Sequence, residues 1–364
     1  MQTVPFLPFD LPFSEPLTKA AYQAFHQGKN LFGITHRDWS RRARQLVDPP
    51  QHPVTSKIDA PLLAKLQQRF DQLLEVDWDD AQQGVYPVSL LFDNPWDDFF
   101  RFYPAVWLDT PQVWRRSNQR QHQEFSDGID TAGYPKYYLQ NFHHQSDGYL
   151  SESSANLYDL QVELLFGGTA DAMRRRVLAP LKRGLAAFDT VLPQQTRILD
   201  IACGTGRTLK MLRSSFPKAL LHGTDLSAAY LRKANQLLSQ DSGELPQLLQ
   251  SNAETLPYQN NQFHGVTSVF LFHELPAVAR QNIINECFRV LQPQGTFVIC
   301  DSVQVSDAPE MKAFLENFPA TFHEPYYRHY STDDIEARLQ KAGFVDIKTE
   351  VHFMSKYWVA DKPA

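Results

Sequence analysis

A glycine-containing turn between a short apolar strand and a helix is the part of this sequence best suited to binding a ligand. Residues Arg197 to Thr208 read R-I-L-D-I-A-C-G-T-G-R-T. The apolar residues suit a buried parallel strand ending at Asp200, and Gly204 and Gly206 let the backbone bend sharply and approach a ligand. The first N–H groups of the next helix can then bind an anion. The pattern predicts a nucleotide-type cofactor site, although a lone G-x-G turn leaves several cofactors open.

A second apolar run, from Ala219 to Thr224, ends in an acidic residue, Asp225. An acid at the end of the second strand of a doubly wound sheet holds ribose hydroxyls. Ser227 fits the cap of the helix that follows. Asp225 is therefore predicted to bind a sugar, and a role as a helix cap is the alternative.

Three later segments narrow the choice of cofactor. Residues 251–254 read S-N-A-E, an apolar run at 266–272 leads into H-E-L-P, and R-V-L-Q-P-Q-G at 289–295 precedes a strand at 296–300. The four motifs D-I-A-C-G-T-G, T-D-L-S, N-A-E-T-L-P and R-V-L-Q-P-Q-G therefore follow one another in order.

In this order the motifs resemble those of the class I S-adenosylmethionine (SAM) dependent methyltransferases. The resemblance is to the group with the ubiquinone and menaquinone C-methyltransferases (methyltransferase type 11) and sterol-type methyltransferases, and it covers roughly residues 161–358. It implies an α/β fold with a Rossmann-like, doubly wound, seven-stranded methyltransferase sheet, and S-adenosyl-L-methionine as the cofactor.

The resemblance also implies roles for individual residues. The glycines of the turn wrap the methionine part of SAM, Asp225 bonds the ribose, residues 252–254 flank the adenine, and Tyr158 covers the cofactor. An ordinary turn is the alternative for the glycines, and a solvated loop end for Asn252 and Glu254. The expected cofactor-binding set is Asp200, Ala202, Cys203, Gly204, Gly206, Asp225, Leu226, Asn252, Ala253, Glu254, Phe270 and Tyr158.

Residues 134–159 contain five tyrosines, two histidines and an Asp-Gly turn, with Ser151 as a helix cap. In related methyltransferases the segment ahead of the first strand folds over the cofactor as a lid. This would place His143, His144 and Asp147 within reach of a substrate, and a satisfied turn is the alternative for the histidine pair.

Methyl transfer from a sulfonium requires the acceptor atom, the methyl carbon and the sulfur nearly in line, with water excluded. Where the acceptor carries a proton, a base of pKa near the working pH helps, and histidine suits that role. His273 is the first candidate because the carboxyl ends of strands in doubly wound sheets face the ligand crevice. The His143-His144 pair, His323 and His329 are further candidates, and a helix-start role is the alternative for His273.

The expected activity is SAM-dependent methyl transfer to a small-molecule or lipid-like acceptor. Aromatic residues of an insertion at 304–330 are expected to line an apolar acceptor pocket. F-H-E-L at the exit of the fourth strand, where enzymes that methylate adenine or glutamine carry N-P-P-Y, argues against that class. A nucleic-acid methyltransferase and a non-catalytic SAM-binding regulatory or assembly protein are the alternatives.

Length and composition predict a cytoplasmic protein of two parts. The chain of 364 residues exceeds one domain of about 150 residues. Residues 1–160 are expected to form a helical, aromatic-rich accessory or lid region, and residues 161–364 the SAM-binding domain. A formal charge of −6 argues against a general affinity for nucleic acid, and three cysteines predict a reducing compartment without disulfides. No apolar run reaches the about 20 residues of a membrane span, and no ligand spacing predicts a metal.

Three further expectations concern segments outside the motifs. The proline-rich apolar residues 1–13 suit an extended segment packed across a groove of the same protein, with an interaction tail as the alternative. The aromatic residues at 77–80 and 94–104 are expected to pack in a core with solvated acids between them, and an aromatic-lined pocket mouth is the alternative. The basic run Arg174–Arg176, with Lys182 and Arg183, is expected to be solvated, and contact with phosphates or anionic lipid is the alternative.

Overall fold

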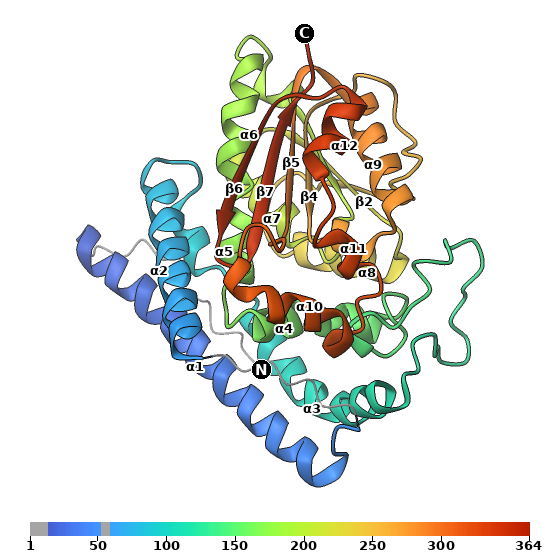
Figure 1. Ribbon diagram of the computed structural model, residues 1–364. Helices are drawn as coiled ribbons and strands as arrows, with labels where there is room; N and C mark the ends of the chain where they lie inside the picture. The colour runs from blue at the N-terminus through green and yellow to red at the C-terminus, as the bar shows by residue number, and fades with distance from the viewer. Residues whose placement is uncertain (1–13, 52–58) are drawn as a thin grey trace.

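The computed structural model describes residues 14–51 and 59–364, so the expectation for residues 1–13 lies outside the described residues. In this part of the chain seven strands form one sheet in the order β3-β2-β1-β4-β5-β7-β6 (Figure 1). Strands β1 to β5 pair in parallel, and β7 is antiparallel to both of its neighbours. The predicted doubly wound, seven-stranded sheet is therefore confirmed. The strands are β1 (Arg197–Ile201), β2 (Leu220–Asp225), β3 (Gln247–Gln250), β4 (Phe263–Val269), β5 (Leu291–Ser302), β6 (Val345–His352) and β7 (Ser355–Asp361).

Helices cover both faces of the sheet and its carboxyl end. Among residues 14–51 and 59–364, no helix is long and apolar enough to cross a membrane. The α-helices are α1 (Glu15–Val47), α2 (Ala60–Gln82), α3 (Trp96–Gln119), α4 (Glu152–Leu165), α5 (Ala170–Arg175), α6 (Leu178–Leu185), α7 (Arg207–Ser215), α8 (Ala228–Leu238), α9 (Ala277–Val290), α10 (Lys312–Phe322), α11 (Tyr327–Tyr330) and α12 (Ile335–Ala342). Short 3-10 helices that matter for the site are η2 (Phe142–His144) and η5 (Phe272–Glu274).

Alternate residues of the central strands belong to different cores, as the two-residue period of a strand requires. Ile198 of β1 packs into a cluster with Leu209 of α7, while its neighbour Leu199 packs into a second cluster with Ile283 of α9. Both strand residues have no exposed surface. A strand buried on both faces reads as a continuous apolar run, which is why β1 was recognisable in the sequence.

The N-terminal helices share a core with the sheet. Tyr22 of α1 and Leu73 of α2 belong to the same buried cluster as Ile198 of β1. Figure 1 shows α1, α3, α4 and α10 gathered at one end of the sheet, with α2 beside α5. The region ahead of residue 161 is therefore packed against the elements that carry the motifs.

The expectation that the charges of residues 77–80 and 174–176 are solvated is wrong for most of them. Arg174–Arg176 and Asp77 and Asp80 are all buried. Arg175 Nη2 donates to Asp77 Oδ2 at 2.6 Å, and Arg176 pairs with Asp80. The two charged runs lie almost a hundred positions apart, and α2 and α5 bring them together, so each supplies the partner that the other needs when buried.

We predict that Asp77→Asn lowers the free energy of unfolding by about 3–5 kcal/mol, because it leaves the buried Arg175 guanidinium without its counter-charge. Urea unfolding measures this loss. Asp79→Asn is the matched control, since Asp79 lies on the same helix but is exposed, and it should change stability by less than about 0.5 kcal/mol. Equal unfolding midpoints for the two variants would contradict the prediction.

Candidate active site

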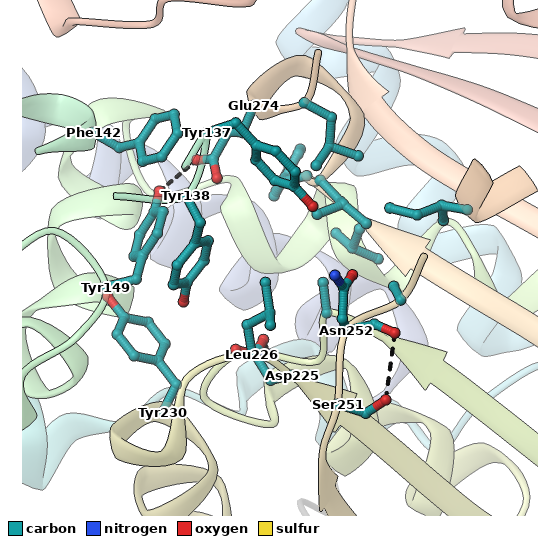
Figure 2. A pocket seen from close by; sticks show the side chains of 18 of the residues that line it. Tyr137, Tyr138, Phe142, Tyr149, Asp225, Leu226, Tyr230, Ser251, Asn252 and Glu274 are labelled. Carbon is teal, nitrogen blue, oxygen red and sulfur yellow. Dashed lines mark hydrogen bonds between the residues drawn. The ribbon is translucent and has the colours of Figure 1, made fainter. Parts of the chain in front are cut away.

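A cavity lies at the carboxyl ends of β1, β2 and β4, between the turn after β1 and the segment ahead of α4 (Figure 2). Figure 2 shows aromatic rings along one side, Ser251 and Asn252 on the other, and Asp225 between them. All predicted cofactor residues line the cavity except Asp200, Cys203, Gly206 and Glu254. The lining residues are Tyr137, Tyr138, Phe142, Tyr149, Tyr158, Ala202, Gly204, Asp225, Leu226, Tyr230, Ser251, Asn252, Ala253, Val269, Phe270, Leu271, Glu274, Leu275 and Ile283.

Gly204 and Gly206 have different structural roles in the turn. Gly204 has a φ of +54°, and a Cβ placed there would meet, among the described residues, only Tyr230, at 4.0 Å. Gly206 has a φ of +83° and caps α7, and a Cβ there would lie 3.0 Å from the Cβ of Ala234. Gly204 therefore leaves open space on the cavity side, whereas Gly206 permits close packing of α7 on α8.

Asp225 is held in place by the turn it faces. The backbone N–H of Gly204 donates to Asp225 Oδ2 at 2.9 Å, and that of Ser227 donates to Oδ1 at 2.8 Å. Burial raises the pKa of Asp225 to about 6, against the opposing effect of these two donors. A carboxylate at a cavity wall, opposite a position without a Cβ, fits a ligand that offers hydroxyl donors, as a ribose does.

Of the four predicted residues that do not line the cavity, Gly206 packs against α8, and the other three are buried or hydrogen-bonded within the protein. Asp200 accepts a hydrogen bond from Thr267 Oγ1 at 2.7 Å, and burial raises its pKa to about 7. Cys203 is buried. Glu254 accepts hydrogen bonds from the Tyr137 hydroxyl at 2.7 Å and from Asn282 Nδ2 at 2.8 Å, so it ties the segment ahead of α4 to α9.

Residues 134–159 form the aromatic wall of the cavity. Gly148 makes the turn possible, because its φ is +53° and a Cβ there would lie 2.3 Å from the carbonyl oxygen of Gln140. Ser151 caps α4 by accepting from the N–H of Ser154, as predicted. The Ser227 hydroxyl donates to the carbonyl of Tyr149 at 2.6 Å, which fastens this wall to the start of α8.

A second cavity adjoins the first and shares Tyr158, Phe270 and Glu274 with it. The insertion at 304–330 supplies part of its lining, as expected, through Phe314, Phe318 and Tyr327; its other aromatic residues Phe322, Tyr326 and Tyr330 are not among the lining residues. The walls are mostly apolar and aromatic. The polar side chains at this cavity include His143, His273 and Glu274.

His273 is paired with a buried carboxylate. Its Nδ1 lies 2.7 Å from Asp301 Oδ1, and Asp301 has no exposed surface. Burial lowers the pKa of His273, but Asp301 outweighs it and raises the pKa to about 10. At neutral pH this geometry favours a cationic imidazole over the general base that we expected from the sequence.

His143 lies between two carboxylates. Its Nε2 is 3.0 Å from Glu324 Oε1 and 3.5 Å from Glu274 Oε1. Burial lowers the pKa of His143, but Glu324 and Glu274 outweigh it and raise that pKa. Burial raises the pKa of Glu324 to about 7, which His143 and His273 oppose. The two predicted catalytic histidines therefore belong to one cluster of acids and imidazoles at the second cavity.

Sequence reasoning missed Glu324 and Tyr230. Glu324 follows α10 in the insertion, far along the chain from His143, and the only local signal was the aromatic stretch around it. Tyr230 lies on α8, and its hydroxyl bonds Ser154 at 2.8 Å. The remaining histidine candidates lie elsewhere: His323 stacks on His122 with ring centroids 3.6 Å apart, and His329 is exposed beside Arg280.

Comparisons with known proteins agree with this geometry. A family model described as a methyltransferase domain matches residues 198–295. Malonyl-[acyl-carrier protein] O-methyltransferase of Geobacter sulfurreducens is 26% identical over 196 residues, 48% of this chain and 72% of that protein. Demethylmenaquinone methyltransferase of Thermotoga maritima is 28% identical over 230 residues, 57% of this chain and 90% of that protein.

Two further matches cover a smaller share of the proteins concerned. A ubiquinone/menaquinone biosynthesis C-methyltransferase of Desulfotalea psychrophila is 28% identical over 151 residues, and the match spans 42% of this chain and 56% of that protein. The solved structure of phosphoethanolamine N-methyltransferase 2 of Haemonchus contortus in complex with SAM has a TM-score of 0.37 and 17% identity, over 50% of this chain and 53% of that one. A structural likeness at this level adds no argument about function.

The motifs that follow β1, β2, β3 and β4 thus converge on one cavity, and the matched domain spans the same strands. Residues 198–295 therefore form a methyltransferase domain, and the chain is similar to SAM-dependent methyltransferases, enzymes whose cofactor is SAM.

Proposed function

We propose that this methyltransferase transfers a methyl group to a small-molecule or lipid-like acceptor held in the second cavity. The observation that carries the proposal is the wall of Tyr158, Phe270 and Glu274 that both cavities share. A donor in the first cavity and an acceptor in the second then meet at one place, as in-line transfer requires. The malonyl-carrier and demethylmenaquinone relatives support an acceptor of this broad class.

Different residues of the first cavity are suited to different parts of SAM. Bound SAM supplies a methyl group on a positively charged sulfur. Gly204 leaves room for the ligand beside the backbone, and Asp225 accepts hydrogen bonds from the ribose hydroxyls. Asn252 and Ala253 line the side of the cavity that the family resemblance gives to the adenine.

The aromatic wall supplies the exclusion of water. Tyr138, Tyr149 and Tyr230 line the first cavity, and Tyr149 packs edge-on against Tyr230 with ring centroids 5.5 Å apart. Exclusion of water strengthens the electrostatic attraction between a cationic ligand and the carboxylates of Asp225 and Glu274. We therefore propose that residues 1–160 act as the accessory and lid region for a SAM-binding domain at residues 161–364.

The second cavity favours an apolar acceptor over a nucleic acid. Phe314, Phe318 and Tyr327 face it, and the chain carries a formal charge of −6, which repels polyphosphates. The three cysteines are free and buried.

We predict that Asp225→Ala weakens binding of S-adenosylhomocysteine by about 10- to 100-fold, since it removes a charged hydrogen-bond acceptor worth about 1.5–3 kcal/mol. Isothermal titration calorimetry measures the change. Asp241→Ala, which removes an exposed acid on the surface near α7, is the control and should bind like the wild type. Unchanged affinity in Asp225→Ala would exclude the proposed ribose contact.

The affinity for S-adenosylhomocysteine should also depend on pH through Asp225, whose pKa burial raises to about 6. Ribose hydroxyls bind the ionised carboxylate, so protonation competes with the ligand as pH falls through that value. Affinity should be level above pH about 7 and about tenfold weaker at pH about 5. Asp225→Asn should flatten this profile, and an identical profile in both proteins would argue against the assignment.

The acceptor class is tested with methyl-labelled SAM and a cell extract. Label should enter compounds that partition into organic solvent, and Phe318→Ala should lower transfer by about tenfold while leaving S-adenosylhomocysteine affinity unchanged. Phe100→Ala, at an exposed ring outside the second cavity, is the control. Label in RNA would favour the nucleic-acid alternative, and no label at all would favour the non-catalytic one.

A further inference from the structure

We propose that His143, Glu274 and Glu324 form a binding site for one divalent metal ion at the second cavity. The three residues come from η2, from η5 and from the segment that follows α10, and each offers one ligand atom within 4.8 Å of the others. The chain thus brings an imidazole and two carboxylates together from segments that share no local motif. No part of the proposed methyl transfer assigns a metal to them.

The spacing of the ligand atoms fits coordination to a common ion. His143 Nε2 lies 3.0 Å from Glu324 Oε1 and 3.5 Å from Glu274 Oε1. Ligand bonds of about 2.0–2.2 Å at angles between square and tetrahedral place two donor atoms about 3.0–3.5 Å apart. These two separations therefore leave room for an ion at a normal bond length from His143 and from either carboxylate.

Glu324 gives the second, independent observation. Its side chain has no exposed surface, and within the described residues neither carboxylate oxygen makes a hydrogen bond. Its contact with His143 Nε2 has ion-pair distance but lacks hydrogen-bond geometry. A buried carboxylate without donors is costly, and a metal ion removes that cost.

The charges of the cluster favour a cation as well. Three carboxylates, on Glu274, Glu324 and Asp301, face two imidazoles, on His143 and His273. Carboxylates therefore outnumber imidazoles in this cluster, which favours a cation between them.

Contacts around the ligands hold them in position. The Tyr149 hydroxyl donates to Glu274 Oε1, and Arg116 Nε donates to the carbonyl of His144, the neighbour of His143, at 2.9 Å. Outer contacts of this kind orient metal-binding side chains. Mixed imidazole and carboxylate ligands suit Mn²⁺, Fe²⁺ or Zn²⁺ better than Ca²⁺ or Mg²⁺.

The position of the site indicates what the ion is for. Glu274 lines both cavities, and His143 lines the second. An ion held there would bind an acceptor through oxygen and lower the pKa of its hydroxyl. This use rests on the proposed function, and it narrows the acceptor to an oxygen-bearing molecule such as a phenol or an enol.

The test uses full-length protein dialysed against chelator, with Mn²⁺ as the probe and calorimetry and electron paramagnetic resonance as readouts. Wild type should bind one Mn²⁺ per chain, and Glu324→Gln and His143→Ala should each weaken that binding at least about tenfold. Glu310→Gln is the matched control, because Glu310 also lies in the insertion but pairs with Lys65 away from the cluster. Its Mn²⁺ affinity should equal that of the wild type.

Three outcomes separate this site from the proposed function. Wild type that binds S-adenosylhomocysteine but no stoichiometric Mn²⁺ overturns the metal site alone. Equal Mn²⁺ affinity in wild type, Glu324→Gln and His143→Ala also overturns it, since the ion is then held elsewhere. Stoichiometric Mn²⁺ that is lost in both cluster variants supports the site, even in a protein that fails to bind S-adenosylhomocysteine. Thermal unfolding of each variant shows that it is folded.

Discussion

The hydrogen bond from the Gly204 N–H to the Asp225 carboxylate is the contact on which the rest of the site depends. It spans 2.9 Å and joins the turn after β1 to the end of β2. The turn reaches it only through left-handed backbone at Ala202, Gly204 and Gly206. This turn leads into α7, and it leaves a cavity that is lined by the backbone of the turn and by the Asp225 carboxylate. The same few residues therefore connect β1 to α7, join the turn to the end of β2 and line the cofactor cavity.

Buried ion pairs connect this turn to the N-terminal helices. Arg207, the first residue of α7, pairs with Asp171 of α5 and lies 3.5 Å from the carboxylate of Asp93, which follows α2. Arg175 of α5 in turn pairs with Asp77 of α2. Arg207, Asp171, Arg175 and Asp77 are buried, so removing one partner of either pair leaves the other unpaired at high cost. The accessory region is thus held to the base of the cofactor cavity by charge as well as by apolar contact.

The sequence predicted the sheet and most of the first cavity, because both depend on local patterns. The buried strand at 197–201, the glycine turn and the acid after β2 are each readable from neighbouring residues. The pairing of Asp77 with Arg175 and the meeting of His143 with Glu324 depend on packing between distant segments. No periodicity or spacing encodes such contacts. The predicted solvation of the charged runs was wrong for that reason, and His273 acquired a partner, Asp301, that changed its expected charge.

The central claim is that donor and acceptor meet at the wall shared by the two cavities. A crystal structure of the protein with S-adenosylhomocysteine tests it most directly. The account predicts the ribose on Asp225 and the sulfur facing Tyr158, Phe270 and Glu274, open toward the second cavity. A ligand bound with its sulfur turned away from that wall, or bound outside the first cavity, would contradict it.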